Sequence, residues 1–401
     1  MPFSELANRF FTGLPNNASA GFCIEYFSQR LYTTKLLTSN FVLLITKVLR
    51  LELQSNILPL EIRQQLRQQI IDLKPAGFES LALRIFQYQA KNNPVYSRYI
   101  SYLNIDIEKV TELIHIPFLP IQFFKNHTIK SGTPPEPTVI FESSGTSGTS
   151  TSRHALYDAP LYQSVSTSIF EQNYGHLKNF HLLVLLPSYL ERNNSSLVYM
   201  MQHFIDEADS PYSNFYLHNT DEMLKRLKNL ATNPDGRNIL LMGVTFALLD
   251  LAESGIDFSF FKNIANLKIM DTGGMKGRRQ ELLREEVHDI LKGSFAVPEI
   301  HSEYGMTELL SQSYSPGSGL FIPGNTMRIL LRDVNDPFSI FDHNLSGSKT
   351  GGINVIDLAN LDSCSFIETQ DLGRFGTKPG TFYVMGRFDN SDIRGCNLLV
   401  L

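Results

Sequence analysis

The sequence predicts an α/β protein, because strand-like apolar runs alternate with helical segments through its middle. Four runs are typical of buried strands: HLLVLLP at 181–187, NILLMGV at 238–244, NLKIMDT at 266–272 and PEIHSEY at 298–304. Segments with apolar residues three and four apart, as in amphipathic helices, lie between them at 196–208, 221–231 and 278–292. Strands separated by helices predict mainly parallel sheets with helices on their faces.

The flanking regions have different patterns. Helical spacing at 62–73 and 78–92 predicts two helices joined through Pro75-Ala76-Gly77, and TVIFE at 138–142 predicts a short strand. After Gly319 the pattern changes to short strands, TMRILLRD, GGINVID and TFYVMGR, separated by turn residues. We therefore expect an N-terminal segment whose packing the sequence leaves open, an α/β core and a smaller β-rich C-terminal subdomain, at 1–57, 58–320 and 321–401.

Composition narrows the class of protein. Of 401 residues, 42% are hydrophobic and 19% charged, which suits a large globular core. Lys and Arg are scattered and the net charge is −5, so we expect no nucleic-acid partner. The apolar run 41–49 is far shorter than the roughly 18 residues of a membrane helix. Cys23, Cys364 and Cys396 have no paired spacing, which favours a reducing cytoplasm over disulfides or zinc.

The segment ESSGTSGTSTSRH at 142–154 is the first candidate site. Glycines let backbone N–H groups approach a phosphate, hydroxyls add donors, and a cation balances charge. A flexible Ser/Gly linker is the alternative. The segment follows a predicted strand directly, which favours a phosphate-binding loop with these candidate residues: Ser143, Ser144, Gly145, Thr146, Ser147, Gly148 and Arg153.

The heptapeptide EYGMTEL at 303–309 combines an aromatic ring, a hydroxyl and a carboxylate. Tyr304 is a candidate to stack on a base, Thr307 to donate to a phosphate oxygen, and Glu308 to hold Mg2+. The alternative is a strand-to-loop turn with a solvated Glu.

Two further turns carry candidate residues. In DTGGMKGR at 271–278, a strand end runs into Gly273 and Gly274, which would leave backbone N–H groups free at the carboxyl edge of a parallel sheet. In TQDLGRF at 369–375, the carboxylate of Asp371 can accept from two donors at once. A plain tight turn is the alternative for both.

These motifs, with GRFDNSDIRGCNL at 386–398, resemble in order those of the acyl-adenylating superfamily, which includes acyl-CoA synthetases, nonribosomal adenylation domains and firefly luciferase. The resemblance implies a large adenylate-forming domain that uses ATP and Mg2+, with Asp371 and Arg387 at the ribose and Asp389 at a hinge. The sequence departs from the usual pattern at Ser152-Arg153-His154, in place of Pro-Lys-Gly, and at Gln370, in place of Gly.

Within that superfamily the chain most closely resembles acyl-protein synthetases of the bacterial luciferase (lux) fatty-acid reductase system, through PSYLERNNSSLVYM at 187–200 and IRGCNLL near its end. The usual mobile C-terminal domain with its Lys is expected to be absent. In that branch a cysteine near the C-terminus accepts the acyl group, and Cys396 holds the matching position. The alternative is a small buried core residue.

The resemblance thus implies activation of a carboxylic acid, expected to be a fatty acid, to acyl-AMP, then transfer to a protein thiol that feeds an acyl reductase partner. Two alternatives stay open. An acyl- or aryl-CoA ligase similar to phenylacetate-CoA ligases would form a CoA-dependent thioester. A non-catalytic nucleotide-binding relative would bind ATP without pyrophosphate exchange. The sequence does not identify the acid.

Overall fold

A computed structural model describes residues 60–143, 151–186, 194–216, 219–274, 282–343 and 349–388. The chain divides into two compact units, Met1–Gln65 and Leu66–Leu401, and the architecture below is that of the second unit. The segment 1–57 lies outside the described residues. The predicted domain boundaries stay predictions.

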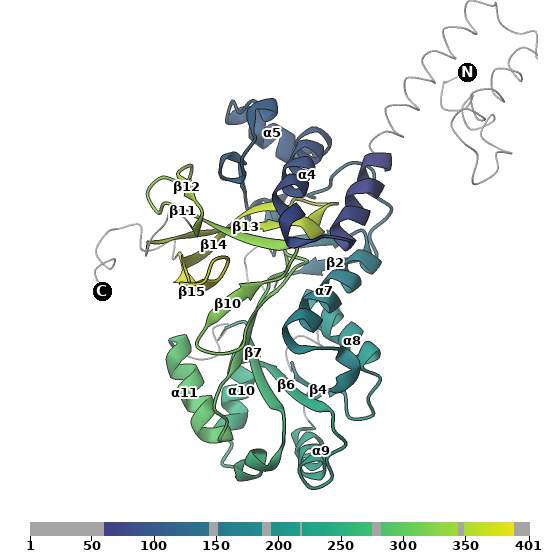
Figure 1. Ribbon diagram of the computed structural model, residues 1–401, viewed down its shortest axis with the longest axis vertical. Helices are drawn as coiled ribbons and strands as arrows, with labels where there is room; N and C mark the ends of the chain where they lie inside the picture. The colour runs from purple at the N-terminus through teal and green to yellow at the C-terminus, as the bar shows by residue number, and fades with distance from the viewer. Residues whose placement is uncertain are drawn as a thin grey trace, which may run out of the picture. The chain divides into compact units, whose positions relative to one another are not determined.

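One large mixed sheet organises the unit (Figure 1). Thirteen described strands form it, in the order β12-β11-β13-β14-β15-β10-β9-β8-β7-β6-β4-β5, with β1 beside β14. Strands β5, β4, β6, β7 and β8 pair in parallel, whereas the pairs from β8 through to β12 are antiparallel. The α/β prediction is confirmed, but the sheet is mixed, and the predicted parallel order holds for one half only.

The parallel half matches the predicted alternation of strands and helices. Its strands are β4 (Phe180–Leu185), β5 (Asn214–Phe215), β6 (Asn238–Val244), β7 (Leu267–Thr272) and β8 (His301–Tyr304). Its helices are α7 (Ala159–Tyr174), α8 (Ser196–Ala208), α9 (Thr220–Thr232), α10 (Thr245–Ala252) and α11 (Arg284–Phe295). In Figure 1, α7 with α8 and α10 with α11 lie on opposite sides of these strands. Coverage on both faces explains why β4 and β6 are almost continuously apolar.

The antiparallel half is built from consecutive strands, as predicted, but β13 and β14, at 8 and 10 residues, are longer than expected. They are β9 (Ser313–Ser315), β10 (Leu320–Pro323), β11 (Met327–Arg332), β12 (Ile340–Phe341), β13 (Thr350–Asp357), β14 (Phe366–Phe375) and β15 (Phe382–Arg387), with β1 (Leu119–Pro120) beside them. These elements bury polar and charged side chains as well as apolar ones: Arg332, Asn354, Asp357, Thr369 and Asp371.

Helices that precede the sheet in sequence pack on its antiparallel half. The described helical turns at 60–71 are followed by η1 (Pro75–Gly77), α4 (Phe78–Asn92) and α5 (Pro94–Tyr102), which confirms the two predicted helices. Phe86 of α4 and Tyr96 of α5 place their rings 5.9 and 6.2 Å from the ring of Phe366 on β14. Gln89 donates to the carbonyl oxygens of Asn360 and Leu361, which fixes α4 beside the turn before β14.

A separate hairpin carries the Ser/Thr/Gly segment. Strand β2 (Val139–Glu142) pairs antiparallel with β3 (Arg153–Leu156), so the predicted strand at 138–142 is confirmed. Helix α7 starts two residues after β3, where the Asp158 carboxylate accepts from the Leu161 N–H at 3.0 Å and Arg67 Nε lies 2.6 Å from Asp158 Oδ2.

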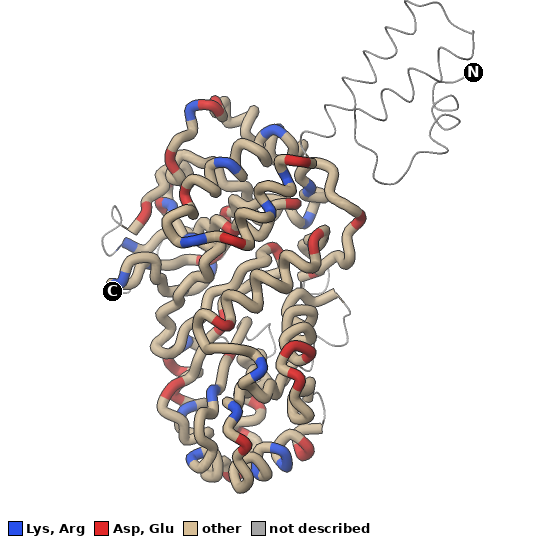
Figure 2. The backbone as a smooth tube through the Cα atoms, turned by 45° about the vertical axis from the view of Figure 1, so that its right-hand side comes forward, with Lys and Arg blue, Asp and Glu red and all other residues tan. Residues whose placement is uncertain are grey.

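Charge is mixed over the described surface. Figure 2 shows Lys and Arg interspersed with Asp and Glu along the backbone, in keeping with the scattered sequence positions. Among the helices that the structure describes, none has the length and apolar character needed to cross a membrane.

Candidate functional site

The base of the Ser/Thr/Gly segment is held closed. The Ser143 N–H donates to the Ser152 carbonyl at 3.0 Å, and the Ser152 N–H donates to Ser143 Oγ at 2.9 Å. The two ends that flank the Ser/Thr/Gly segment are therefore joined to each other. The candidates Ser144, Gly145, Thr146, Ser147 and Gly148 lie outside the described residues.

The two basic residues after the loop have different surroundings. Arg153 is exposed, and its Nε lies 3.4 Å from Glu142 Oε1 across the hairpin. The side chain of His154 is buried on the opposite face of β3, and burial lowers its pKa to about 4. His154 is therefore not a second exposed cation beside Arg153, because its imidazole is buried and burial lowers its pKa.

Glu308 lies in the segment that follows β8, and its side chain is buried. Its carboxylate accepts a hydrogen bond from the Ser152 hydroxyl at the base of the loop. Burial raises the pKa of Glu308, the charge of Asp371 raises it further, and Ser152 and Arg387 oppose both effects. The buried carboxylate thus lies within electrostatic reach of Asp371 and Arg387.

Tyr304, Asp371 and Arg387 form a connected cluster. The Tyr304 hydroxyl donates to Asp371 Oδ2 at 2.8 Å, and Arg387 Nε lies 3.2 Å from Asp371 Oδ1. Asp371 on β14 and Arg387 on β15 are directly opposite in the strand register. Burial raises the pKa of Asp371, and the Arg387 charge and the Tyr304 hydroxyl oppose that rise. The Arg387 side chain is 72% exposed, so its guanidinium is accessible to a ligand.

The Tyr304 ring is packed among aromatic side chains. Its centroid lies 5.8 Å from that of Phe321 and 5.5 Å from that of Phe382, and only 8% of the residue is exposed. This packing turns the hydroxyl toward Asp371. Stacking of Tyr304 on a base stays a prediction.

Thr307 is held through its backbone. Its carbonyl oxygen lies 2.9 Å from His154 Nδ1, and the residue is half-buried beside the buried Glu308. The next carbonyl, that of Glu308, accepts from Asn360 Nδ2 at 2.8 Å. Two buried side chains therefore fix two successive peptide groups at the proposed phosphate and metal positions.

Gly273 and Gly274 follow β7 at the carboxyl edge of the parallel strands, as predicted. Gly273 has φ of 72°, a left-handed conformation that favours glycine, and its carbonyl accepts from Thr245 Oγ1 at 3.2 Å. Below the turn, Asp271 Oδ1 accepts from the Ser302 hydroxyl at 2.5 Å and lies 3.4 Å from His288 Nε2. Burial alone would raise the pKa of Asp271, but its hydrogen bonds to His288 and Ser302 and the charges of Arg284 and His288 lower it overall.

The structure thus brings together candidates from three separate motifs and the strand after the loop. Tyr304, Asp371, Arg387 and Glu308 are linked by direct contacts or by charge, with Ser152 joined to Glu308. Asp389 and Cys396 lie outside the described residues, as does Cys23. The thiol of Cys364 is buried and burial raises its pKa to about 12, which suits a structural cysteine.

Sequence reasoning missed two buried charged residues beside the cluster. Arg332 donates to the carbonyls of Ile353 and Thr369, and its charge acts on Asp371. Asp357 accepts from the N–H groups of Leu310 and Ser311, just after Glu308. The available signal was the presence of charged residues within the predicted strands TMRILLRD and GGINVID.

Comparisons with known proteins gave no match: no protein-family model matches the sequence, and no curated protein matches it. The geometry of the site therefore carries the functional proposal.

The residues present fit a nucleotide-bound Mg2+. No cluster of three or more His, Cys, Asp or Glu able to hold a metal occurs in the part of the chain that the structure describes. Magnesium in nucleotide sites is commonly held by one or two carboxylates together with phosphate oxygens and water. Glu308, a hard oxygen donor beside the loop base, suits that mode with a single protein ligand.

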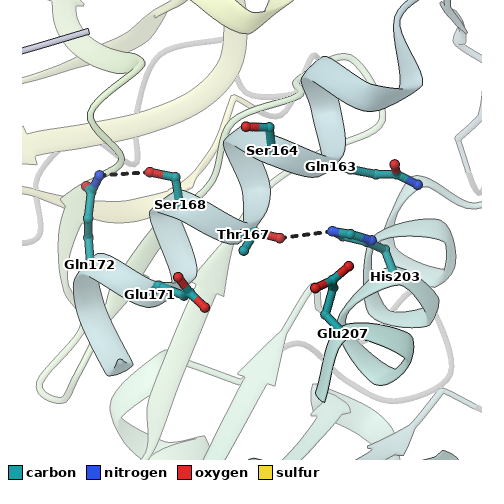
Figure 3. A pocket seen from close by; sticks show the side chains of 8 residues that line it. All are labelled: Gln163, Ser164, Thr167, Ser168, Glu171, Gln172, His203 and Glu207. Atoms are coloured by element: carbon teal, nitrogen blue, oxygen red, sulfur yellow. Dashed lines mark hydrogen bonds between the residues drawn. The ribbon is translucent and has the colours of Figure 1, made fainter. Parts of the chain in front are cut away.

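A polar groove of about 530 Å³ lies elsewhere, between α7 and α8 (Figure 3). Four of its eight lining side chains pair with one another: Thr167 Oγ1 lies 2.9 Å from His203 Nε2, and Gln172 donates to Ser168 at 3.1 Å. None of the predicted site residues lines it. We place the candidate site at the motif residues, because buried, mutually coupled charges are typical of functional sites.

A Ser–His–Asp contact also occurs at the start of β4. His181 Nδ1 lies 2.6 Å from Ser210 Oγ, and its Nε2 lies 3.0 Å from both carboxylate oxygens of Asp235. The Tyr212 ring covers the imidazole at 5.1 Å, and the Tyr212 N–H donates to Ser210 Oγ. Because the His181 imidazole is packed against Tyr212 and the Ser210 hydroxyl is already hydrogen-bonded, we infer that this cluster fixes two loops to the strand.

Proposed function

We propose that the chain activates a carboxylic acid, a fatty acid in the first instance, with ATP to form acyl-AMP and then passes the acyl group to a protein thiol. The observation that carries the proposal is the convergence of residues from separate motifs. Tyr304 and Glu308 come from one motif, and Asp371 and Arg387 come from two others more than sixty residues later in the sequence, yet contacts and charge link all four beside the base of the Ser/Thr/Gly loop. Chance matches of short motifs have no reason to converge in space.

The roles follow from the chemistry of each group. A substrate carboxylate oxygen attacks the α-phosphorus of ATP, the bond from that phosphorus to the bridging oxygen breaks, and pyrophosphate leaves. Asp371 accepts from the ribose hydroxyls, and Arg387 is the neighbouring cation. Thr307 donates to an α-phosphate oxygen, and the loop hydroxyls with Arg153 balance the β and γ phosphates. Mg2+, held by Glu308, would supply charge neutralisation at the reacting phosphates.

The cluster exchanges partners when a nucleotide binds. In the free protein Asp371 Oδ2 accepts from Tyr304 and Oδ1 faces Arg387. Each oxygen has a second lone pair, so ribose hydroxyls can donate while the Tyr304 contact is kept. The exposed Arg387 is free to turn toward the ligand, which suits a carboxylate that is held ready by its neighbours.

The direct test is carboxylate-dependent ATP–pyrophosphate exchange with short, long and aromatic acids. The proposal predicts exchange that needs both an acid and Mg2+, and that is fastest with a fatty acid. ATP binding without exchange for any acid would instead identify a non-catalytic nucleotide-binding relative. Exchange followed by thioester formation only on added CoA would identify a CoA ligase.

The second half-reaction is tested at Cys396. A thiolate attacks the acyl carbonyl, the bond to the AMP oxygen breaks, and a thioester forms. With ATP and a labelled acid we expect a hydroxylamine-sensitive protein adduct that Cys396→Ser abolishes while exchange continues. Cys364→Ser is the matched control, because that thiol is buried and its pKa is raised. Label that persists in Cys396→Ser would contradict the assignment.

A further inference from the structure

A buried histidine links the strand after the Ser/Thr/Gly loop to the segment that contains Thr307 and Glu308. His154 is the second residue of β3, opposite Phe141 in the hairpin register. Its neighbour Arg153 points to solvent, so the alternation of side chains along the strand turns His154 inward. The Phe124 ring meets the imidazole edge-on at 5.3 Å.

The contacts of His154 determine its tautomer. A carbonyl oxygen can only accept, so Nδ1, 2.9 Å from the Thr307 carbonyl, carries the hydrogen. In the neutral imidazole Nε2 is then an acceptor, and it lies 2.8 Å from the Ser363 hydroxyl, which donates. Burial lowers the pKa of His154 to about 4, so this neutral form persists over the physiological range.

The segment held by His154 has little other freedom. The Glu308 carbonyl is fixed by Asn360, and the Leu310 and Ser311 N–H groups are fixed by Asp357. His154 holds the Thr307 carbonyl, while Ser152 at the base of the loop holds the Glu308 carboxylate. His154 thus helps to set the plane of the peptide between Thr307 and Glu308. The direction of both side chains depends on that plane.

We propose that His154 is a positioning residue, an inference that rests on the proposed function. It orients the peptide between Thr307 and Glu308, so that both side chains are directed toward the reacting phosphate. It touches neither ATP nor the acid. Its hydrogen bond transmits the position of the β2–β3 hairpin to the metal-binding carboxylate. A misplacement on the order of 1 Å at a reacting group costs up to about a hundredfold in rate.

Two isosteric variants separate the contacts of the imidazole. In His154→Asn the amide nitrogen occupies the place of Nδ1 and can still donate to the Thr307 carbonyl. In His154→Gln the amide occupies the place of Nε2, so the Thr307 contact is lost. Ser363→Ala removes the hydroxyl at Nε2, together with its 3.4 Å contact to the Asn360 carbonyl, and leaves the Thr307 contact in place, so it is the matched control.

We expect His154→Gln to lower kcat for pyrophosphate exchange about tenfold or more and to raise the Mg2+ concentration needed for half-maximal rate. KM for the acid should stay unchanged. His154→Asn and Ser363→Ala should remain within about threefold of the wild type. A purely structural role predicts equal loss of folded protein in all three variants with no change in Mg2+ dependence, and that result would overturn the proposal.

Hydrogen exchange tests whether His154 positions the segment 304–311 without relying on an activity assay. In His154→Gln, amides of the segment 304–311 should exchange about tenfold faster than in the wild type, while those of β4 and β6 keep their protection. Unchanged exchange in 304–311 would contradict a positioning role. If the wild type showed no ATP–pyrophosphate exchange with any acid, the proposed function would be refuted. The hydrogen-exchange result would then still decide whether His154 holds the segment 304–311.

Discussion

The two halves of the sheet bury different types of side chain. The parallel strands β4 and β6 bury mainly Leu, Val, Ile and Met side chains, with His181 of β4 as a buried polar residue. In the antiparallel half, Arg332 lies buried and donates to Asn354 Oδ1 at 2.8 Å and to the Thr369 carbonyl at 2.6 Å, near the buried Asp371. A Cβ at Gly352 would collide with the Arg332 guanidinium, so glycine makes room for this charge.

Burying charge costs free energy unless the groups are paired and hydrogen-bonded, and apolar packing would stabilise a sheet as well. Strands β4 and β6 bury no carboxylate or guanidinium, whereas β7 and β8, next to the antiparallel half, bury Asp271 and Glu303. Buried charged groups therefore gather in the antiparallel half and on the strands that adjoin it, and this is the side of the sheet where we expect chemistry. The comparison predicts that substitutions in one half change stability and that those in the other change activity.

The largest effect is expected for Glu308→Gln, which should lower pyrophosphate exchange about a thousandfold with the fold intact, because a ligand of Mg2+ is lost at the reacting phosphate. The measurement is the rate of ATP–pyrophosphate exchange, with circular dichroism to show that the variant is folded. Glu207→Gln in the α7–α8 groove is the control and should behave as the wild type. Wild-type exchange in Glu308→Gln would remove this carboxylate from the site.

In the parallel half, Leu241→Ala should lower the free energy of unfolding by about 3 kcal/mol, because it leaves a cavity beside a fully buried position of β6. KM for ATP of the folded variant should not change. Denaturant unfolding and exchange kinetics on one preparation test both statements. Leu283→Ala, at an exposed position, should cost less than about 0.5 kcal/mol. A selective rise in KM for ATP in Leu241→Ala would break the comparison.

Strand β8 joins the two halves and carries Glu303, whose buried carboxyl accepts from the Thr272 hydroxyl. Burial raises its pKa from 4.5 to about 7, although the Thr272 hydrogen bond opposes the shift. The folded state therefore holds a proton that the unfolded state has lost between these values, and wild-type stability falls as pH rises through that window.

Glu303→Gln mimics the protonated form and should not show this loss. Relative to the wild type, the variant should gain roughly 3 kcal/mol between pH 4.5 and pH 8, at 1.36 kcal/mol per pKa unit. Thermal or urea unfolding across that range measures the difference. Parallel pH curves for the two proteins would show that Glu303 titrates normally.

The smallest effect is expected for Asp371→Ala, which should raise KM for ATP about tenfold with a smaller change in kcat, because ribose contacts are alike in ground and transition states. Arg387 and Tyr304 lose their partner in this variant, so Asp371→Asn, which keeps one acceptor, is the matched control. An unchanged KM for ATP in Asp371→Ala would reject the ribose role.

Most predicted elements with clear periodicity were correct, although the helix predicted at 278–292 is observed as α11, which begins only at Arg284. The apolar spacing at 196–208 predicted α8 with its observed bounds, and the four apolar runs became β4, β6, β7 and β8. Helix α7 was not predicted, since APLYQSVSTSIFEQNY mixes polar and apolar residues without a strong stripe. The antiparallel order was also beyond reach, because strand register depends on long-range pairing.

The sequence predicted which residues belong to the candidate site better than it predicted how they contact one another. Motifs pointed to Asp371 and Arg387, but only the strand register shows that they are partners across β14 and β15. The sequence places Arg153 and His154 side by side without showing which of them faces solvent. Adjacent residues of a strand face opposite sides, so one of the two had to turn inward, and the hairpin determines that it is His154.

The most direct measurement of the central claim is a crystal structure with a non-hydrolysable acyl-adenylate analogue. The account predicts ribose hydroxyls at Asp371, the linkage that replaces the α-phosphate beside Thr307, and Glu308 within reach of a bound metal. An analogue bound in the polar groove between α7 and α8, or anywhere away from Glu308 and Asp371, would contradict it.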